Sequence, residues 1–243
     1  MRAVTREELS HERLGDEFLS ALSIYDTRRR VETLVDDFLS DDMVKGRLAL
    51  DVGCGLGFFS ARLVQRGAKV IACDIGPGLV EQTRRKAGCD ARVADALSLQ
   101  QEFGNERFDL VISSECIEHV PSPSAALQQM IAVLKPGGFL SISTPNRIWH
   151  PLVSLATKLR LRPFDGYENF STWRSLREAL EAGGVSILRE QGLHLFPFQF
   201  HLPRLSTWCD RHLQIFRGAM INLCVLGQKQ RTPQSDPAIF RAQ

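Results

Sequence analysis

Short apolar runs alternate with amphipathic stretches through the middle of the 243-residue chain. The apolar runs predict five strands, at LALDV (48–52), KVIACD (69–74), ARVAD (91–95), FDLVISS (108–114) and GFLSIST (138–144). The stretches between them predict helices near 58–66, 78–87 and 122–134. Parallel strands need crossover connections, so this alternation predicts an α/β fold, with a parallel sheet covered by helices on both faces.

The residues before the first strand, 1–44, are expected to form a helical cover over this core. Apolar residues recur there at helical spacing within 5–22 and within 28–40. The first residues are charged throughout and lack the apolar run of a signal peptide. Since no later stretch reaches the roughly 18 apolar residues that a spanning helix needs, a cytoplasmic protein is expected.

Beyond the fifth strand, one helix and two more strands are predicted. The helix covers 172–182, with Ser171 or Thr172 as its N-cap and two glycines after its end. VSILRE (185–190) and AMINLCVLGQK (219–229) read as strands, and the second is close enough to pair antiparallel with an earlier strand.

These elements place the domain boundaries. The main domain is expected to span 45–229, and the polar, proline-containing segment 230–243 is predicted to be a disordered tail.

Composition and charge exclude several classes of protein. The chain is 44% hydrophobic and 24% charged, as in soluble globular proteins, and its net charge of +2 gives no general attraction for nucleic acid. Its six cysteines are scattered singly, without a CxxC pair or zinc-finger spacing. We therefore expect free thiols and no nucleic-acid partner.

A glycine-rich loop follows the first strand, in LALDVGCGLGFFS (48–60). Gly53, Gly55 and Gly57 allow a sharp turn and a close approach to a ligand, and the helix start beyond them favours negatively charged groups. A dinucleotide-binding GxGxxG motif would need a small residue where Phe58 stands. The loop is therefore a poor match for a pyrophosphate.

Two acidic residues next to this loop change the expected ligand. Asp51, just before the glycines, would repel a pyrophosphate but attract an amino group or a sulfonium, either directly or by fixing the loop. Asp74 ends the second strand, where a carboxylate can accept hydrogen bonds from both ribose hydroxyls. Together they indicate a nucleoside with a cationic amino-acid tail.

Four motifs stand in the order found in class I S-adenosylmethionine-dependent methyltransferases, which the chain resembles over residues 45–190. They are DVGCGLG (51–57), Asp74, VADA (93–96) and LKPGGFLSIST (134–144). The resemblance implies a Rossmann-like, doubly wound sheet of seven strands, six parallel and one antiparallel. It also implies S-adenosylmethionine as cofactor and S-adenosylhomocysteine as product.

The resemblance also assigns the contacts with the cofactor. Gly53 and Gly55 would lie beside the methionine moiety, and Ser114 near the sulfonium. Asp74 would bind the ribose, Asp95 and the Ala96 backbone the adenine amino group, and Ile75 the adenine ring. Arg30 would meet the cofactor's carboxylate, unless the run of arginines around it is a solvated helix face. The predicted cofactor-binding set is Arg30, Asp51, Gly53, Cys54, Gly55, Asp74, Ile75, Asp95, Ala96, Ser114 and Glu115.

A second cluster, in SSECIEHVPSP (113–123), offers two carboxylates and an imidazole after the fourth strand. If the segment is helical, Glu115 and Glu118 share a face, and His119 joins Glu115 at i, i+4. Such a set, Glu115, Glu118 and His119, suits Mg²⁺, which could hold a substrate hydroxylate. Alternatively, Glu118 and His119 could be catalytic without a metal, His119 acting as general base, or the cluster could only shape the pocket.

This E-x-x-E-H pattern resembles the ubiquinone-biosynthesis O-methyltransferases (3-demethylubiquinone methyltransferases) and the small-RNA 2′-O-methyltransferases that bind a metal through it. The ubiquinone enzymes also share a segment like STPNR (143–147). Where they carry a histidine before the next helix, RPFDGYENFSTW (162–173) has none.

Two segments, 145–171 and 192–205, are the candidates for contact with the group that receives the methyl. The insert 145–171 is expected to be a lid, although its aromatic residues could simply pack on the domain. The apolar segment 192–205 could make a peripheral membrane or lipid contact, or be a buried crossover. The sequence thus predicts methylation of a small-molecule hydroxyl, phenol- or quinol-like. N-methylation of an amine or amino sugar, RNA 2′-O-methylation and a non-catalytic binding protein are the alternatives.

Overall fold

The computed structural model describes residues 24–159, 167–195 and 203–231. Its strands are β1 (Leu48–Val52), β2 (Lys69–Asp74), β3 (Asp90–Val93), β4 (Phe108–Ser114), β5 (Leu134–Pro145), β6 (Val185–Leu193) and β7 (Asn222–Lys229). Its α-helices are α2 (Ile24–Val31), α3 (Asp41–Val44), α4 (Phe58–Gln65), α5 (Pro77–Ala87), α6 (Leu99–Phe103), α7 (Pro123–Val133), α8 (His150–Lys158), α9 (Trp173–Ala182) and α10 (Pro203–His212). Shorter turns are the π-helix η1 (Glu32–Asp37) and the 3₁₀ helices η2 (Ile117–His119), η3 (Arg147–Trp149) and η5 (Gln214–Ala219).

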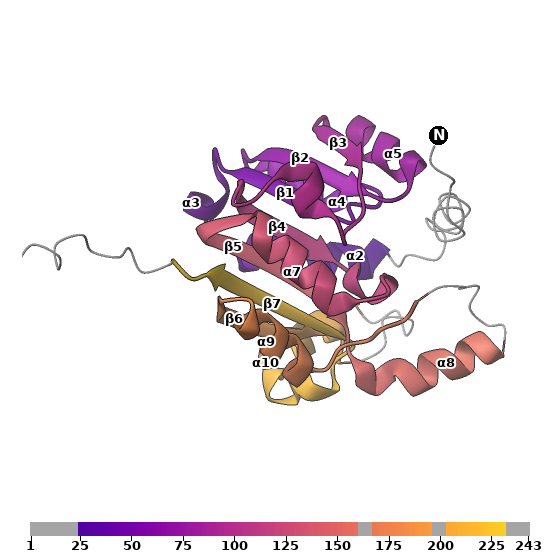
Figure 1. Ribbon diagram of the computed structural model, residues 1–243. Coiled ribbons are helices and arrows are strands. Elements are labelled where there is room, and N and C mark those ends of the chain that lie inside the picture. The colour runs from indigo at the N-terminus through magenta and orange to yellow at the C-terminus, as the bar shows by residue number, and fades with distance from the viewer. Residues whose placement is uncertain (1–23, 160–166, 196–202, 232–243) are drawn as a thin grey trace, which may run out of the picture.

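A single seven-stranded sheet organises the molecule, with helices on both faces (Figure 1). The strand order is β3-β2-β1-β4-β5-β7-β6. Neighbours from β3 to β5 pair parallel, whereas β7 pairs antiparallel with both β5 and β6. Six strands therefore share one direction and β7 opposes them, which confirms the predicted doubly wound sheet.

The elements before β1 differ from their prediction. Where a helix over 28–40 is expected, α2 is already helical at Ile24, the first described residue, and is followed by the π-helix η1 to Asp37. The expected helix over 5–22 and most of the expected tail lie outside the described residues. None of the helices in the described ranges is long and apolar enough to cross a membrane.

The predicted cap of the helix after β5 can be assigned to one residue. Thr172 is the N-cap of α9, because its hydroxyl accepts a hydrogen bond from the Ser175 amide and its own amide donates to the Ser175 hydroxyl. Gly183 ends the helix as predicted.

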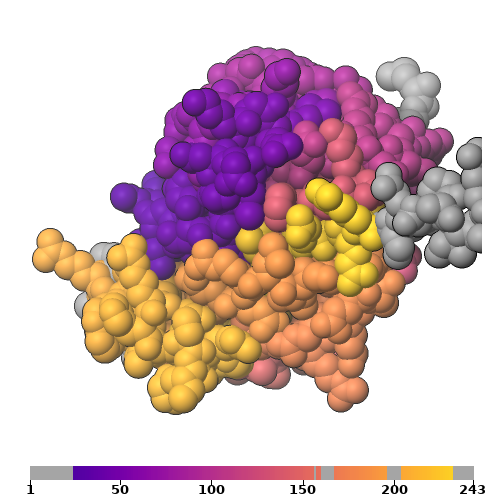
Figure 2. Space-filling model, turned by 90° about the vertical axis from the view of Figure 1, so that its left-hand side faces the viewer, coloured from indigo at the N-terminus to yellow at the C-terminus, as the bar shows by residue number. Residues whose placement is uncertain are grey.

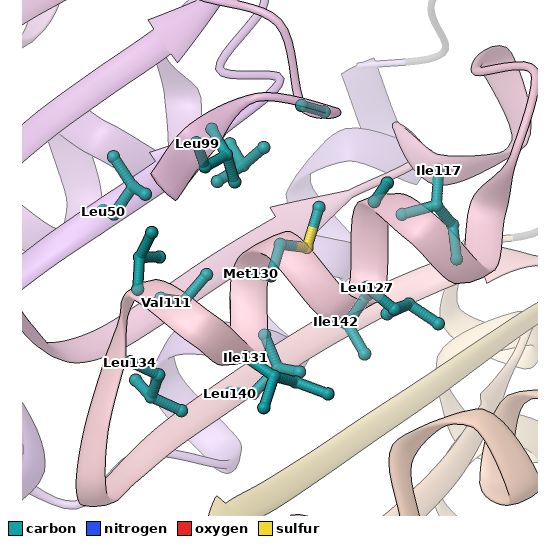
Figure 3. Packing of buried hydrophobic residues seen from close by; sticks show 14 of the residues in the cluster. Leu50, Leu99, Val111, Ile117, Leu127, Met130, Ile131, Leu134, Leu140 and Ile142 are labelled. Atoms are coloured by element: carbon teal, nitrogen blue, oxygen red, sulfur yellow. The ribbon is translucent and has the colours of Figure 1, made fainter. Parts of the chain in front are cut away.

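The core lies on both faces of the sheet because successive side chains of a strand point to opposite faces. Val111 of β4 packs in the cluster on the α7 side, where Met130 and Ile131 are buried (Figure 3). Its neighbours Leu110 and Ile112 pack in a second cluster with residues of η1 and α4. Burial on both faces explains why the middle of β4, from Leu110 to Ile112, is continuously apolar.

The amino-terminal elements pack against the carboxyl-terminal third of the chain, and Figure 2 shows their two surfaces side by side. Arg189 of β6 donates to the Asp37 carbonyl, and its guanidinium lies 5.0 Å from the centre of the Phe38 ring. On β5, the Ser141 hydroxyl donates to the Leu34 carbonyl at 2.9 Å. These contacts hold η1 and the residue after it against β5 and β6.

Candidate functional site

The glycine loop between β1 and α4 is fastened to the end of β2. The amides of Gly53 and Cys54 both donate to the Cys73 carbonyl, at 2.9 and 3.0 Å. The Gly55 amide donates to Asp74 Oδ2 at 2.9 Å, while Asp74 Oδ1 accepts from the Gly76 amide at 3.0 Å. Asp74 therefore sets the shape of the loop. Because each carboxylate oxygen can accept more than one hydrogen bond, it keeps capacity for a ligand.

Gly53 and Gly55 have different surroundings, although both have a positive φ, of 70° and 51°. A Cβ added to Gly53 would lie 2.5 Å from Cys116 Sγ, so packing against the β4 end excludes any side chain there. A Cβ added to Gly55 would meet no atom of residues 24–159, 167–195 and 203–231 within 4 Å. Gly55 thus borders open space, which a bound group could fill.

Asp51 lies beneath this loop and is only 2% exposed. Its Oδ2 accepts a 2.5 Å hydrogen bond from the Ser60 hydroxyl, which joins β1 to α4. Burial raises the pKa of Asp51 to about 7, and the charge of Asp74 adds to the rise, although the hydrogen bonds from Ser60 oppose it. Asp51 holds the loop against the helix that follows it.

The residues predicted to hold adenine lie after β3, beside the end of β2. The Ala94 amide donates to the Asp74 carbonyl at 3.0 Å, which brings the two loops together. Asp95 Oδ1 accepts from the Leu97 amide at 2.9 Å, Ala96 is 9% exposed and Ile75 is half-buried. Asp74, Ile75, Asp95 and Ala96 therefore lie on neighbouring loops at one sheet edge.

Four polar side chains form a hydrogen-bonded chain from α2 across the ends of β4 and β5. Arg30 Nη1 donates to the Ser114 hydroxyl at 2.7 Å, and the hydroxyls of Ser114 and Ser143 lie 2.9 Å apart. Ser143 donates to Glu115 Oε1 at 2.9 Å. Burial, assisted by the charge of Glu118, raises the pKa of Glu115 to about 7 despite the opposing charge of Arg30.

The other side of the Arg30 guanidinium is bound to Asp26, one turn earlier on α2. Arg30 Nε and Nη2 donate to Asp26 Oδ2 at 3.2 and 2.8 Å, and Asp26 Oδ1 lies 2.9 Å from His194 Nε2. Burial disfavours the Asp26 carboxylate, yet the charge of Arg30 and the hydrogen bond with His194 hold the pKa of Asp26 well below its usual range. Arg30 is only 4% exposed, so it is not a solvated helix charge.

The structure gives no support for the predicted Mg²⁺ site at Glu115, Glu118 and His119. Glu115 has a left-handed backbone, with φ of 51°, and precedes η2, so the helical spacing assumed for the three side chains does not exist. Glu115 hydrogen-bonds with Ser143, whereas His119 hydrogen-bonds with the Tyr167 carbonyl. In the described part of the chain no three His, Cys, Asp or Glu side chains are placed to hold a metal ion.

Glu118 and His119 instead form a pair. His119 Nε2 lies 3.8 Å from Glu118 Oε1, and the buried Glu118 accepts a 3.3 Å hydrogen bond from Thr144 through Oε2. His119 Nδ1 lies 3.1 Å from the Tyr167 carbonyl, which can only accept, so Nδ1 carries the proton. In the neutral imidazole, Nε2 is then the basic nitrogen.

The carboxyl-terminal part of the predicted lid, 145–171, lies next to this pair. The Asn169 amide donates to the Glu118 carbonyl at 2.9 Å, and Asn169 Nδ2 donates to the Val120 carbonyl at 2.8 Å. Helix α8 projects from the body of the molecule (Figure 1), with Leu152 and Leu155 more than half exposed. Residues 160–166 of the insert, and 196–202 of the segment predicted to contact lipid, lie outside the described residues.

Three residues of this site were not predicted from the sequence: Asp26, His194 and Ser143. They lie on α2, after β6 and on β5, and no local pattern marks any of them as part of a site. Only the fold brings them together around Arg30 and Glu115.

The polar side chains at this edge of the sheet fit a nucleoside that carries an amino acid. The Asp74 and Asp95 carboxylates can accept hydrogen bonds from hydroxyl and amino groups, and open space borders Gly55 between the two loops and the end of β4. Beyond it, Arg30 and Glu115 offer a cation and a carboxyl group to the two charged ends of an amino acid.

Comparison with known proteins gives matches to methyltransferases. The Methyltransferase domain family matches residues 50–142. A ubiquinone biosynthesis O-methyltransferase of Coxiella burnetii is 31% identical over 174 residues, covering 66% of this chain and 74% of that protein. A protein of the same name from Xanthomonas axonopodis pv. citri is 40% identical over 107 residues, or 42% of this chain and 44% of its own.

Solved structures share the fold at lower identity. An S-adenosylmethionine-dependent methyltransferase from Mesorhizobium loti has a TM-score of 0.62 and 21% identity, covering 82% of this chain and 97% of that one. The magnesium protoporphyrin IX methyltransferase of Synechocystis PCC 6803, solved with bound S-adenosylhomocysteine, has a TM-score of 0.61 and 21% identity, covering 85% and 84%.

Proposed function

Because the chain belongs to the S-adenosylmethionine-dependent methyltransferases, we propose that it methylates a hydroxyl group of a small molecule, with His119 as general base. The observation that carries this proposal is the state of His119. Its Nδ1 is committed to the Tyr167 carbonyl, which leaves Nε2 as a base beside the buried Glu118.

The cofactor would be held along the edge formed by the β1, β2, β3 and β4 ends. Asp74 would accept hydrogen bonds from the ribose, Asp95 and Ala96 would meet the adenine, and Gly55 would border the methionine moiety. Ser114 and Arg30 would lie toward the amino-acid end. When bound, S-adenosylmethionine supplies a methyl carbon on a sulfonium, which an acceptor oxygen can displace in line to leave S-adenosylhomocysteine.

His119 has the properties that a general base needs. Its side chain is 25% exposed, so an acceptor can reach it, while its Nδ1 contact fixes the ring orientation. When Nε2 takes the acceptor's proton, the ring becomes a cation 3.8 Å from Glu118 Oε1. The buried carboxylate stabilises that cation, because the attraction between charges is stronger away from water. Glu118 thus assists without touching the acceptor.

The choice of a hydroxyl rests on the relatives and on this base. The relatives matched over most of their length are named as O-methyltransferases. A phenol or quinol hydroxyl needs to lose its proton during transfer, whereas a neutral amine needs little help from a base. The charge balance of +2 gives no support for RNA as the acceptor.

The test is a methyl-transfer screen of phenols, quinols and amino sugars with a radiolabelled methyl donor, using the full chain and the His119→Asn variant. We expect turnover of a phenol or quinol, and a loss of about 10²–10⁴-fold in kcat in the variant. Isothermal titration of S-adenosylhomocysteine should give equal affinity for both proteins, which shows that the variant is folded. Turnover of amino sugars alone, or an unchanged kcat, would contradict the proposal.

A further inference from the structure

We propose that Asp26 and His194 are positioning residues that aim the Arg30 guanidinium at the carboxylate of the cofactor's amino-acid end. The inference rests on the proposed function, since it assumes that this site binds S-adenosylmethionine. It adds two residues from opposite ends of the chain that would determine how well the site recognises that carboxylate.

The geometry of Arg30 shows that Asp26 fixes its orientation. Both residues lie on α2, and Asp26 Oδ2 accepts hydrogen bonds from two nitrogens of the guanidinium, at 3.2 and 2.8 Å. Two bonds from a planar group define its plane as well as its position. The third nitrogen, Nη1, then points to the Ser114 hydroxyl at the end of β4, on the side proposed for the cofactor's amino-acid end.

Asp26 is itself held by His194. Asp26 Oδ1 lies 2.9 Å from His194 Nε2, across 168 positions of sequence. His194 is fully buried and has a left-handed backbone, with φ of 60°, and its amide donates to Asp210 Oδ1 at 2.9 Å. A non-glycine residue keeps such a strained backbone only where its surroundings enforce it, often at functional sites. Here the strained backbone directs the imidazole at Asp26.

Arg30 needs this support because other carboxylates compete for it. Glu115 and Glu118 both act on Arg30 electrostatically, and Glu115 is connected to it through Ser143 and Ser114. If Asp26 were neutral, we expect Arg30 to turn toward Glu115 and to be withdrawn from a ligand carboxylate. Asp26 therefore keeps Arg30 available for the ligand.

The test compares two ligands that differ by one group. S-adenosylhomocysteine carries the carboxylate, and its decarboxylated analogue keeps the adenosine, the sulfur and the amine. Isothermal titration of both compounds should show that the parent protein prefers S-adenosylhomocysteine. In Asp26→Asn we expect its affinity to fall about tenfold or more, with the affinity for the analogue changed less than about twofold.

The second variant, His194→Asn, removes the imidazole but keeps a residue that tolerates left-handed backbone. We expect a loss in the same direction, of about threefold to tenfold. Asp36→Asn is the matched control. Asp36 belongs to the same amino-terminal segment as Asp26, but it makes a 2.9 Å ion pair with Arg62 of α4, away from the side chains around Arg30. Its preference between the two ligands should equal that of the parent.

Affinity for the analogue reports whether each variant is folded, and if Asp26→Asn does not fold, His194→Asn carries the test. Equal losses for both ligands would mean a purely structural role and overturn the inference, as would tighter binding of S-adenosylhomocysteine. A parent that binds both compounds equally would also overturn it, because Arg30 would not meet the carboxylate. A parent that binds neither would refute the proposed function instead.

Discussion

Replacing each of the two glycines that flank Cys54 by alanine should separate the folding role of the loop from its binding role. The backbone is left-handed at both positions, which costs an alanine about 1–2 kcal/mol. At Gly55 no steric cost is added, since the new methyl group would meet no atom within 4 Å in the part of the chain that the structure describes. At Gly53 the methyl group would lie 2.5 Å from Cys116 Sγ and 2.7 Å from its Cβ.

Overpacking of this kind typically costs a further 1–3 kcal/mol or so, because buried neighbours must shift. We therefore expect Gly53→Ala to lower the free energy of unfolding by about 2–5 kcal/mol and Gly55→Ala by about 1–2 kcal/mol. The order reverses for binding. The methyl group of Gly55→Ala occupies the space proposed for the methionine moiety, so S-adenosylhomocysteine should bind at least about tenfold more weakly.

Urea unfolding gives the two stabilities, and isothermal titration gives the affinity. A Cys116→Gly substitution, alone and combined with Gly53→Ala, completes a double-mutant cycle in which relief of the contact should appear as a favourable coupling of about 1–3 kcal/mol. Additive effects of Gly53→Ala and Cys116→Gly would show that the contact is not the cause. Parental affinity in Gly55→Ala would show that the open space is not part of the binding site.

Three further predictions follow from other parts of the structure. Asp74→Ala removes the acceptor of the Gly55 and Gly76 amides as well as the proposed ribose contact. Titration should therefore show that S-adenosylhomocysteine binds at least about tenfold more weakly. Unchanged affinity would contradict the ribose role. The pKa of Asp51 is about 7 in the folded state, above its value of about 3.9 in an unfolded chain. Between these two pH values the folded state binds more protons than the unfolded state. The free energy of unfolding therefore falls as the pH rises from about 3.9 to about 7. Asp51→Asn should remove a slope of up to about 1.4 kcal/mol per pH unit, and equal slopes for parent and variant in urea unfolding between pH 5 and 7 would refute this. Met130 is fully buried, so Met130→Ala should lower the free energy of unfolding by about 2–5 kcal/mol in the same assay. Leu152 is exposed, so Leu152→Ala should change it by no more than about 0.5 kcal/mol. Similar losses in both variants would contradict the packing of these two side chains.

The sheet could be predicted because its strands carry their signal locally. The middle of β4 is buried on both faces, so Leu110, Val111 and Ile112 are all apolar, and the glycine loop and Asp74 follow strands whose ends meet at one edge. The alternation of strands and helices specifies this edge, whereas the assignment of particular residues there to the cofactor came from the resemblance to class I methyltransferases.

The parts that could not be predicted depend on tertiary contacts. The sequence ECIEH allows a helix, but Glu115 adopts a left-handed backbone at the end of β4 and its carboxylate turns toward Ser143, so the three side chains diverge. No local pattern marks His194 as part of a site, because its partner Asp26 is 168 positions away. Helix α10, with the sequence PRLSTWCDRH, has no counterpart among the elements predicted from the sequence.

The position of β7 imposes an order of events on the growing polypeptide. β7 is the last strand in sequence but lies between β5 and β6, which are both translated earlier and have no direct pairing with each other. While the ribosome is still adding residues before Asn222, β5 presents an unpaired edge, which is the kind of surface at which nascent chains associate wrongly. The contact between His194 and Asp26 also waits for residues made late in synthesis. A ribosome that stalls between β6 and β7 would therefore release a chain with an open sheet, and such a product is a natural target for chaperones and proteases.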